Sequence, residues 1–389
     1  LPTEWYSSVL IDTVGKSMPL PLTVTKEDLQ TGSFEYGIPL NKQAYPNPRP
    51  VADVVKELRA AREAAGGVTD NVVWNGGKMY VPVNKEAVLK AGVVNPVYQN
   101  LIVDSIAINV GADYLTKGDL VMYDLVSTMS KEGWKRPIYF TSVSGYDFKG
   151  LNDYLELEGL VYRLVPIRGG SSSRQPLRVN QYKLYSNIVK DYGYYGMKEK
   201  PNFFLDDKAS YVPNDIQQMG LLLAKFYVQK VNVLEQVQKQ VSAGSDLTKM
   251  VSPEEGFANA AEFFAVYSDS IEVYRKRGVE VLNHIMKEIP ESVMPMRREY
   301  RVDYGLTLLS LGDEKGAKIV MDQCLKENLE YYNFFVNELE DDGEGMAFAQ
   351  REIYVSEDLL RRMIKSLDAS GKKALADEYR KQAASIGKF

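Results

Sequence analysis

Histidine and cysteine are almost absent from this chain of 389 residues, which has one of each, His284 and Cys324. A single histidine excludes metal sites built from several histidines, such as the HExxH helix. It also leaves Ser-His-Asp or Cys-His catalysis one candidate base, on a helix predicted over residues 271–289. A single cysteine excludes an internal disulfide, and its place on an apolar helix face predicts a small buried side chain rather than a reactive thiol.

Motifs for phosphates and metals are missing as well. The sequence has no GxGxxG, GxSxG or EF-hand pattern. Gly15-Lys16-Ser17 resembles the end of a P-loop, but Leu10 stands where the leading glycine belongs, so a turn is predicted there. We therefore expect no metal and no cofactor. The net charge of −5 lacks the basic excess of nucleic-acid-binding proteins, so no nucleic-acid partner is expected.

Long apolar runs are also missing. No stretch approaches the roughly 18 apolar residues that a membrane-spanning helix needs. The chain opens with LPTEWYSS, which has no initiator Met and no signal-peptide character. The sequence therefore predicts a soluble fragment from which an upstream part is missing.

The first half of the chain predicts an α/β domain over residues 1–213. Helical spacing indicates a helix over residues 51–65 that ends at Gly66-Gly67, and Thr116 is the expected N-cap of a second helix over residues 117–131. The order strand, helix, strand over residues 101–143 is typical of a βαβ unit, which makes the mixed sheet partly parallel. Strands are expected at residues 78–83, 101–110, 136–143 and 159–167.

The second half, residues 214–389, predicts an all-α domain of tetratricopeptide-like helical hairpins. One stretch fits the repeat well, with a glycine in its first helix, a Gly-Asp turn and an alanine in its second helix. An irregular bundle with one chance match is the alternative. The matching residues are Tyr304, Gly305, Leu308, Gly312, Asp313, Ala317, Met321 and Cys324; weaker copies use Gly278, Leu282, Ile285 and Pro290, and Leu367, Gly371, Ala376 and Ala383.

Three acids lie together in the stretch LNDYLELEG, namely Asp153, Glu156 and Glu158. Two carboxylates across a cleft are able to hydrolyse glycosides, so an independent glycosidase is one hypothesis. The other is a structural turn whose acids pair with Arg136 and Arg163. A cleft holding two of the acids would favour the first, and burial against the arginines the second.

Tyrosine is abundant, with 26 residues, and Tyr192, Tyr194 and Tyr195 cluster in one segment. Exposed tyrosine rings stack on sugars, so this segment is a candidate carbohydrate contact. Simple packing is the alternative, because tyrosine can bury its ring while its hydroxyl remains hydrogen-bonded to water.

Two stretches, WKRPIYF at residues 134–140 and EGLVYRLVP at residues 158–166, together resemble a known family. Its members are bacterial multi-spanning membrane proteins related to the animal transmembrane protein O-mannosyltransferase. TEWY at residues 3–6, PVNKEAV at 82–88 and LTKGDL at 115–120 are also similar to it. The resemblance implies a membrane glycosyltransferase followed by a soluble C-terminal region with tetratricopeptide-like repeats, to which this chain would correspond.

In that family the transferase chemistry belongs to the membrane part, so the resemblance implies an extracytoplasmic accessory domain without catalytic residues. It implies a periplasmic location and a membrane domain upstream of Leu1 as partner. An acceptor protein or peptide on the helical repeats and a carbohydrate are further expected partners. A freestanding repeat scaffold is the remaining alternative. The candidate binding residues are Trp134, Arg136, Asp153, Glu158, Arg163, Tyr194 and Tyr195.

Overall fold

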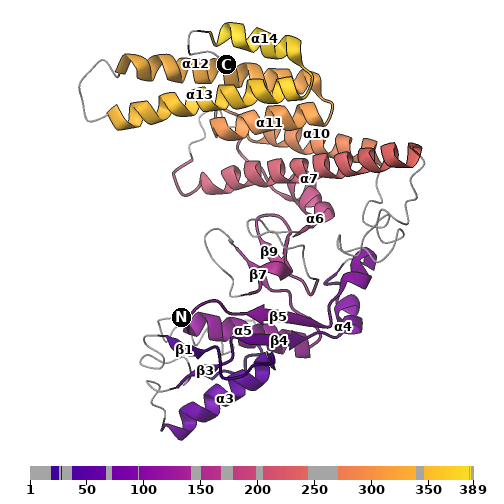
Figure 1. Ribbon diagram of the computed structural model, residues 1–389, viewed down its shortest axis with the longest axis vertical. Coiled ribbons are helices and arrows are strands. Elements are labelled where there is room, and N and C mark those ends of the chain that lie inside the picture. The colour runs from indigo at the N-terminus through magenta and orange to yellow at the C-terminus, as the bar shows by residue number, and fades with distance from the viewer. Residues whose placement is uncertain are drawn as a thin grey trace. The chain divides into compact units, whose positions relative to one another are not determined.

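The computed structural model describes residues 19–25, 28, 37–66, 72–94, 96–141, 150–167, 178–198, 205–243, 270–338, 346–384 and 386 (Figure 1). These residues form two compact units, which divide between Asn180 and Gln181. The first unit holds mixed sheets with helices and the second is helical, so the predicted fold class is confirmed. The predicted domain boundary at residue 213 stays a prediction.

Three small sheets make up the strand structure described in the first unit. One sheet has the order β3-β1-β6, a second has the order β2-β4-β5, and a third has the order β10-β8-β9-β7. The pairs β1–β3, β2–β4 and β8–β10 are parallel and the others antiparallel. The strands are β1 (Ile38–Asn41), β2 (Arg49–Pro50), β3 (Trp74–Asn75), β4 (Lys78–Pro82), β5 (Ser105–Asn109), β6 (Tyr114–Leu115), β7 (Tyr139–Phe140), β8 (Leu155–Leu157), β9 (Tyr162–Leu164) and β10 (Arg178–Val179).

The two helices predicted for this unit, over residues 51–65 and 117–131, begin and end close to those positions. Thr116 and Asp119 form the capping box that starts α5, in which each side chain bonds the other residue's backbone N–H. Asn84 caps α4 by accepting from the backbone N–H of Ala87. The helices are α3 (Val51–Ala64), α4 (Lys85–Lys90) and α5 (Lys117–Lys131), with 3-10 turns η1 (Pro96–Leu101) and η2 (Asn152–Tyr154).

The predicted βαβ unit is wrong. Strand β5 pairs antiparallel with β4, whereas β7 pairs antiparallel with β9 in another sheet, so the strands on either side of α5 are not neighbours. The parallel pairs involve other strands. The reason is physical, because the β7 segment forms only a two-residue strand, too short to specify a parallel partner across a helix.

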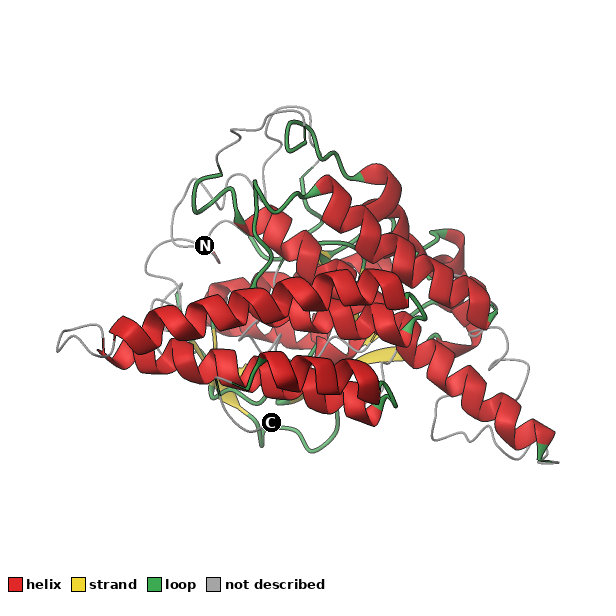
Figure 2. Cartoon of the chain, turned by 90° about the horizontal axis from the view of Figure 1, so that it is seen from above, coloured by secondary structure: helices red, strands yellow, loops and turns green. Residues whose placement is uncertain are grey.

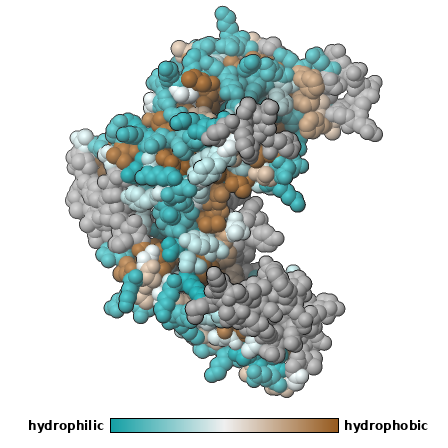
Figure 3. Space-filling view, turned by 180° about the vertical axis from the view of Figure 1, so that it is seen from behind, coloured by the Kyte–Doolittle hydropathy of each residue, from teal (hydrophilic) through white to brown (hydrophobic). Residues whose placement is uncertain are grey.

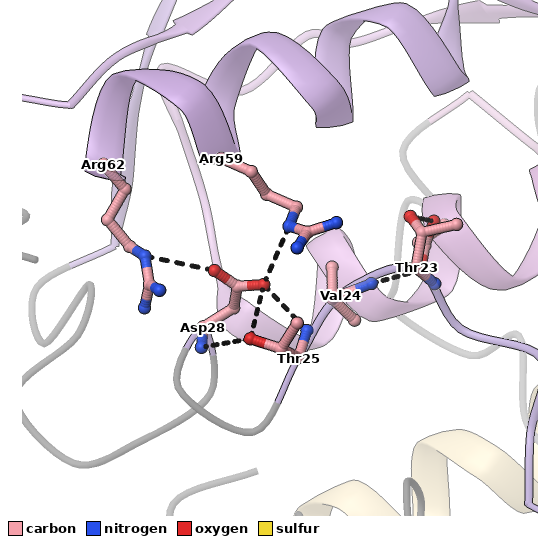
Figure 4. Close-up of polar contacts among 7 residues, drawn as sticks. Thr23, Val24, Thr25, Asp28, Arg59 and Arg62 are labelled. Atoms are coloured by element: carbon pink, nitrogen blue, oxygen red, sulfur yellow. Dashed lines mark hydrogen bonds and ion pairs between the residues drawn. The ribbon is translucent and has the colours of Figure 1, made fainter. Parts of the chain in front are cut away.

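A buried carboxylate ties the stretch before β1 to helix α3. Asp28 is 2% exposed and lies between Arg59 and Arg62 of α3, with nitrogen–oxygen distances of 3.3 and 3.1 Å (Figure 4). The backbone N–H of Thr25 donates to the same carboxylate at 2.7 Å. The two guanidinium groups compensate the buried charge, so Asp28 holds this stretch against the helix.

A second buried carboxylate acts in the same way on α5. Asp124 is 1% exposed and accepts from the backbone N–H groups of Thr23 and Val24 at 2.6 and 3.0 Å. The hydroxyl of Thr23 donates to its other oxygen. Thr23 and Val24 are therefore bonded to α5, as Asp28 is to α3.

Neighbouring helices of the second unit pack side by side, as α7 with α10, α11 with α12, α12 with α13 and α13 with α14 (Figure 2). On the face seen in Figure 3, hydrophilic residues predominate over these helices, with apolar residues between them. Among the described residues, no helix is both long and apolar enough to cross a membrane. The helices are α6 (Gln181–Ser186), the π-helical turn η3 (Asn187–Asp191), α7 (Tyr211–Ser242), α10 (Ile271–Glu288), α11 (Arg298–Ser310), α12 (Glu314–Glu338), α13 (Met346–Ala369) and α14 (Lys373–Gln382).

Glycines allow the close helix contacts that the repeat pattern predicted. A Cβ at Gly305 of α11 would lie 2.5 Å from Cγ of Met321 on α12. A Cβ at Gly278 of α10 would likewise overlap the side chain of Leu311. A Cβ at Gly220 of α7, which the sequence did not single out, would overlap Ile285 of α10. Close approach at a small residue is therefore used three times in succession. The assignment as tetratricopeptide repeats stays a prediction.

Candidate functional site

Four polar side chains form a row across the four-stranded sheet of the first unit. Arg178 of β10 stands opposite Glu156 of β8, Glu156 opposite Arg163 of β9, and Arg163 opposite Tyr139 of β7. Directly opposed residues project from the same face of a sheet, so the row alternates cation, anion, cation and phenol on one face.

Glu158 lies two residues beyond Glu156 and so joins the same face. It is 7% exposed and accepts hydrogen bonds from the hydroxyl of Tyr139 at 3.2 Å and from Arg163 at 3.4 Å. One amide nitrogen of Asn180 donates to both Glu156 and Glu158, at 3.0 Å each. The two acids are thus joined through a shared donor.

Burial dominates the electrostatics of this row. Glu156 is 6% exposed, and burial raises its pKa to about 7 against the opposing effect of Arg178. Glu158 adds to the rise, since two neighbouring carboxylates resist ionising together. Burial likewise lowers the pKa of Arg178. A carboxyl that titrates near neutrality is able in principle to transfer a proton.

Solvent access argues against catalysis by this pair. A glycosidase needs a cleft in which a sugar lies between its two acids. Glu156 and Glu158 are instead covered, and Glu158 pairs with Arg163 as the structural alternative predicted. Arg136 does not take part in that pairing, because it donates to the backbone oxygen of Pro19 at 3.1 Å. The arrangement is that of a polar network holding four strands together.

The other two candidate residues of this unit lie elsewhere. Trp134 is 3% exposed and follows the end of α5 with a positive φ of 60°, an unusual backbone conformation for a bulky residue. Its indole therefore packs in the interior and is not exposed for a ligand to stack on. Asp153 lines a hollow of about 220 Å³ together with Asn109 and Gly150. The three acids of the LNDYLELEG stretch therefore do not face one cleft.

In the second unit, the tyrosine segment lines a pocket of about 270 Å³. Tyr194 is largely buried, whereas Tyr195 is 92% exposed at the edge of this pocket. The opposite wall contains His284 and Glu288 of α10. The sequence prediction had not connected these two with the tyrosines. Their spacing of four residues on one helix face was the available signal.

An open groove of about 650 Å³ lies between α10 and the turn that joins α11 to α12. Both signs of charge line it, with Arg275 and Lys276 beside Glu272, Glu280 and Asp313. The predicted Gly312-Asp313 turn forms one wall, and Gly312 has a φ of 93°. A mixed, open and polar groove of this kind suits an extended peptide better than a small apolar ligand.

Metal chemistry has no visible basis within the ranges that the structure describes. No group of three or more His, Cys, Asp or Glu side chains is placed there to hold a metal ion. Cys324 is buried, and burial raises the pKa of its thiol to about 12. The prediction of a small buried side chain is therefore confirmed at this position, and its low reactivity stays a prediction.

Comparison with known families matches residues 1–183 to the model of TMEM260-associated domain 2. Residues 1–183, just under half of the chain, are similar to this domain. TMEM260 is a protein O-mannosyltransferase, so the resemblance carried by WKRPIYF and EGLVYRLVP is confirmed at the level of a TMEM260-related domain. The polar row on β10-β8-β9-β7 lies within the matched residues, whereas the tyrosine pocket and the groove beside α10 lie beyond them. No curated protein and no solved structure matches the chain.

Proposed function

We propose that this chain is the extracytoplasmic accessory region of a membrane-embedded, TMEM260-like O-mannosyltransferase, without catalytic residues of its own. The observation that carries the proposal is the match of residues 1–183 to TMEM260-associated domain 2. The transferase reaction belongs to a membrane domain upstream of Leu1, on whose periplasmic side the chain lies.

The helical unit supplies the second part of the proposal, which is the binding of an acceptor polypeptide. Support comes from the groove beside α10, whose charges of both signs match the side chains of an extended polar peptide. Lys276 lies exposed on its wall. The membrane domain is the other partner that this unit could hold.

Acceptor binding is tested by titrating residues 1–389 into a fluorescently labelled, unstructured Ser/Thr-rich peptide and following its anisotropy. We expect saturable binding that Lys276→Glu weakens several-fold, because the substitution reverses a charge on the groove wall. Lys365→Glu is the matched control, since Lys365 is also exposed but belongs to α13. Equal binding by both variants, or none by the unchanged chain, would remove the acceptor role.

The membrane part of the proposal has its own test. Translation of the reading frame upstream of Leu1 should give several apolar stretches, each long enough to span a bilayer. A short upstream sequence with a signal peptide would contradict it and favour a freestanding scaffold.

A further inference from the structure

The pocket beside the tyrosine segment brings together side chains from two separate stretches of the second unit. Tyr192, Tyr194, Tyr195 and Lys198 come from the segment after η3, and His284 and Glu288 come from successive turns of α10. The cavity of about 270 Å³ lies near the lower limit for small-molecule sites, so it has room for one compact ligand.

Tyr195 gives the pocket an exposed aromatic face. Its ring occupies the space that a Cβ at Gly193 would need, with Cε2 only 2.5 Å from that position. Glycine at 193 therefore lets the ring lie against the backbone, although 92% of the residue remains exposed to solvent. An aromatic ring held at the rim of a polar pocket offers a flat surface for a ligand with an apolar face.

Tyr194 fixes the opposite side. Its hydroxyl donates to the backbone oxygen of Ile188 at 2.9 Å, and its ring meets His284 edge-on with centroids 5.5 Å apart. Burial lowers the pKa of His284, which leaves the imidazole uncharged at neutral pH. Its Nε2 is buried, and no residue in the described ranges hydrogen-bonds it. This nitrogen lies beneath the pocket surface, so His284 contributes its ring to the wall.

Lys198 and Glu288 complete the wall as an ion pair, with nitrogen and oxygen 2.6 Å apart. Their charges cancel, so the pocket does not select a phosphate or another anion. Side by side they offer a donor and an acceptor, which is what two adjacent hydroxyl groups require, because each hydroxyl both donates and accepts.

We propose that this pocket is a binding subsite for one uncharged pyranose ring of a glycan. The C–H face of the sugar stacks on Tyr195, while its hydroxyls bond to Lys198 and Glu288. The subsite lies outside residues 1–183, so it goes beyond the proposed accessory function and does not depend on the acceptor groove.

Saturation-transfer NMR on residues 1–389 tests this proposal with a panel of methyl pyranosides that includes methyl mannoside and methyl glucoside. We expect transfer to at least one of them, strongest at the axial C–H protons of one ring face. Tyr195→Ala should weaken binding of that glycoside about tenfold or more. Tyr354→Ala is the matched control, because Tyr354 is 68% exposed on α13 and should leave binding unchanged.

Gly193→Ala separates stacking from folding. The added Cβ pushes only an exposed ring aside, so the melting temperature should stay near that of the unchanged chain while glycoside binding falls. Absence of transfer to every pyranoside would overturn the proposal, as would equal binding by Tyr195→Ala. Binding of a nucleoside or a phenol in place of all pyranosides would show that the site takes another class of ligand. Loss of peptide binding alone would affect the acceptor groove and leave this subsite standing.

Discussion

Glu156 and Arg178 face each other on the parallel strands β8 and β10, yet burial raises the pKa of the acid to about 7. The desolvation cost of ionised Glu156 thus exceeds the favourable electrostatic energy of its interaction with the guanidinium, as is common for buried ion pairs. A buried carboxyl of this kind makes the stability of the fold depend on pH.

Glu156 destabilises the fold as pH rises. In the unfolded chain it ionises near its usual 4.5, and in the folded chain near 7, so the folded state binds more protons between these values. Stability contributed by the protonated acid is complete below pH 4.5 and lost through about 7. Glu156→Gln should therefore raise the free energy of unfolding at pH 8 by on the order of 1 to 3 kcal/mol, and leave it nearly unchanged at pH 4.

Denaturant unfolding at the two pH values measures this difference. Glu132→Gln serves as control, because Glu132 is exposed at the end of α5 and should change little at either pH. A Glu156→Gln variant less stable than the parent at pH 8 would show that the pair with Arg178 outweighs burial.

Asp28 should contribute strongly to stability through its contacts with α3. Asp28→Asn removes the charge that Arg59 and Arg62 share, which leaves two guanidinium groups facing an uncharged amide. We expect a loss of about 3 kcal/mol in the free energy of unfolding. Asp53→Asn, at an exposed acid in the first turn of α3, should cost less than about 1 kcal/mol. Equal losses in the two variants would refute this role for Asp28.

Gly305→Ala tests the close contact of α11 with α12. Its methyl group would overlap Met321, so a loss of about 1 to 3 kcal/mol is expected despite the better helix propensity of alanine. Thermal unfolding measures the loss. In a Met321→Ala background the same substitution should cost less, because the space is then open. Additive effects of the two substitutions on stability would show that Gly305 is not required for the contact with Met321.

Cys324 should resist thiol reagents in the folded chain. Burial raises its pKa to about 12, so almost none is thiolate at pH 8. With a chromogenic disulfide reagent we expect reaction at least about a hundredfold slower than in the chain unfolded by guanidinium chloride. Rapid reaction before denaturation would contradict the packing of α12.

Local signals predicted the helices best. Helix ends are marked by interactions within one turn, as Thr116 with Asp119 shows at the start of α5 and Gly66 after the end of α3. The local sequence was therefore sufficient to predict where these helices begin and end. Strand pairing was predicted less well, because two- and three-residue strands such as β7 and β9 take their partners from long-range register.

In the candidate sites too, contacts between residues close in sequence were predicted and contacts between distant segments were not. Glu158 and Arg163 lie five residues apart, and their pairing followed from proximity in the sequence. Arg178 opposite Glu156 was not predicted, because a parallel pair joins distant segments. Tyr195 and His284 line one pocket because α10 packs beside the tyrosine segment, and the four-residue spacing of His284 and Glu288 does not encode that packing.

The measurement that tests the account most directly is the initial rate of mannosyl transfer by the full-length protein at increasing acceptor concentration. An accessory, acceptor-binding role predicts that Lys276→Glu raises KM several-fold and leaves kcat unchanged, since binding and chemistry lie in different parts. It also predicts no turnover by residues 1–389 alone. A fall in kcat with KM unchanged, or transfer by residues 1–389 alone, would contradict the account.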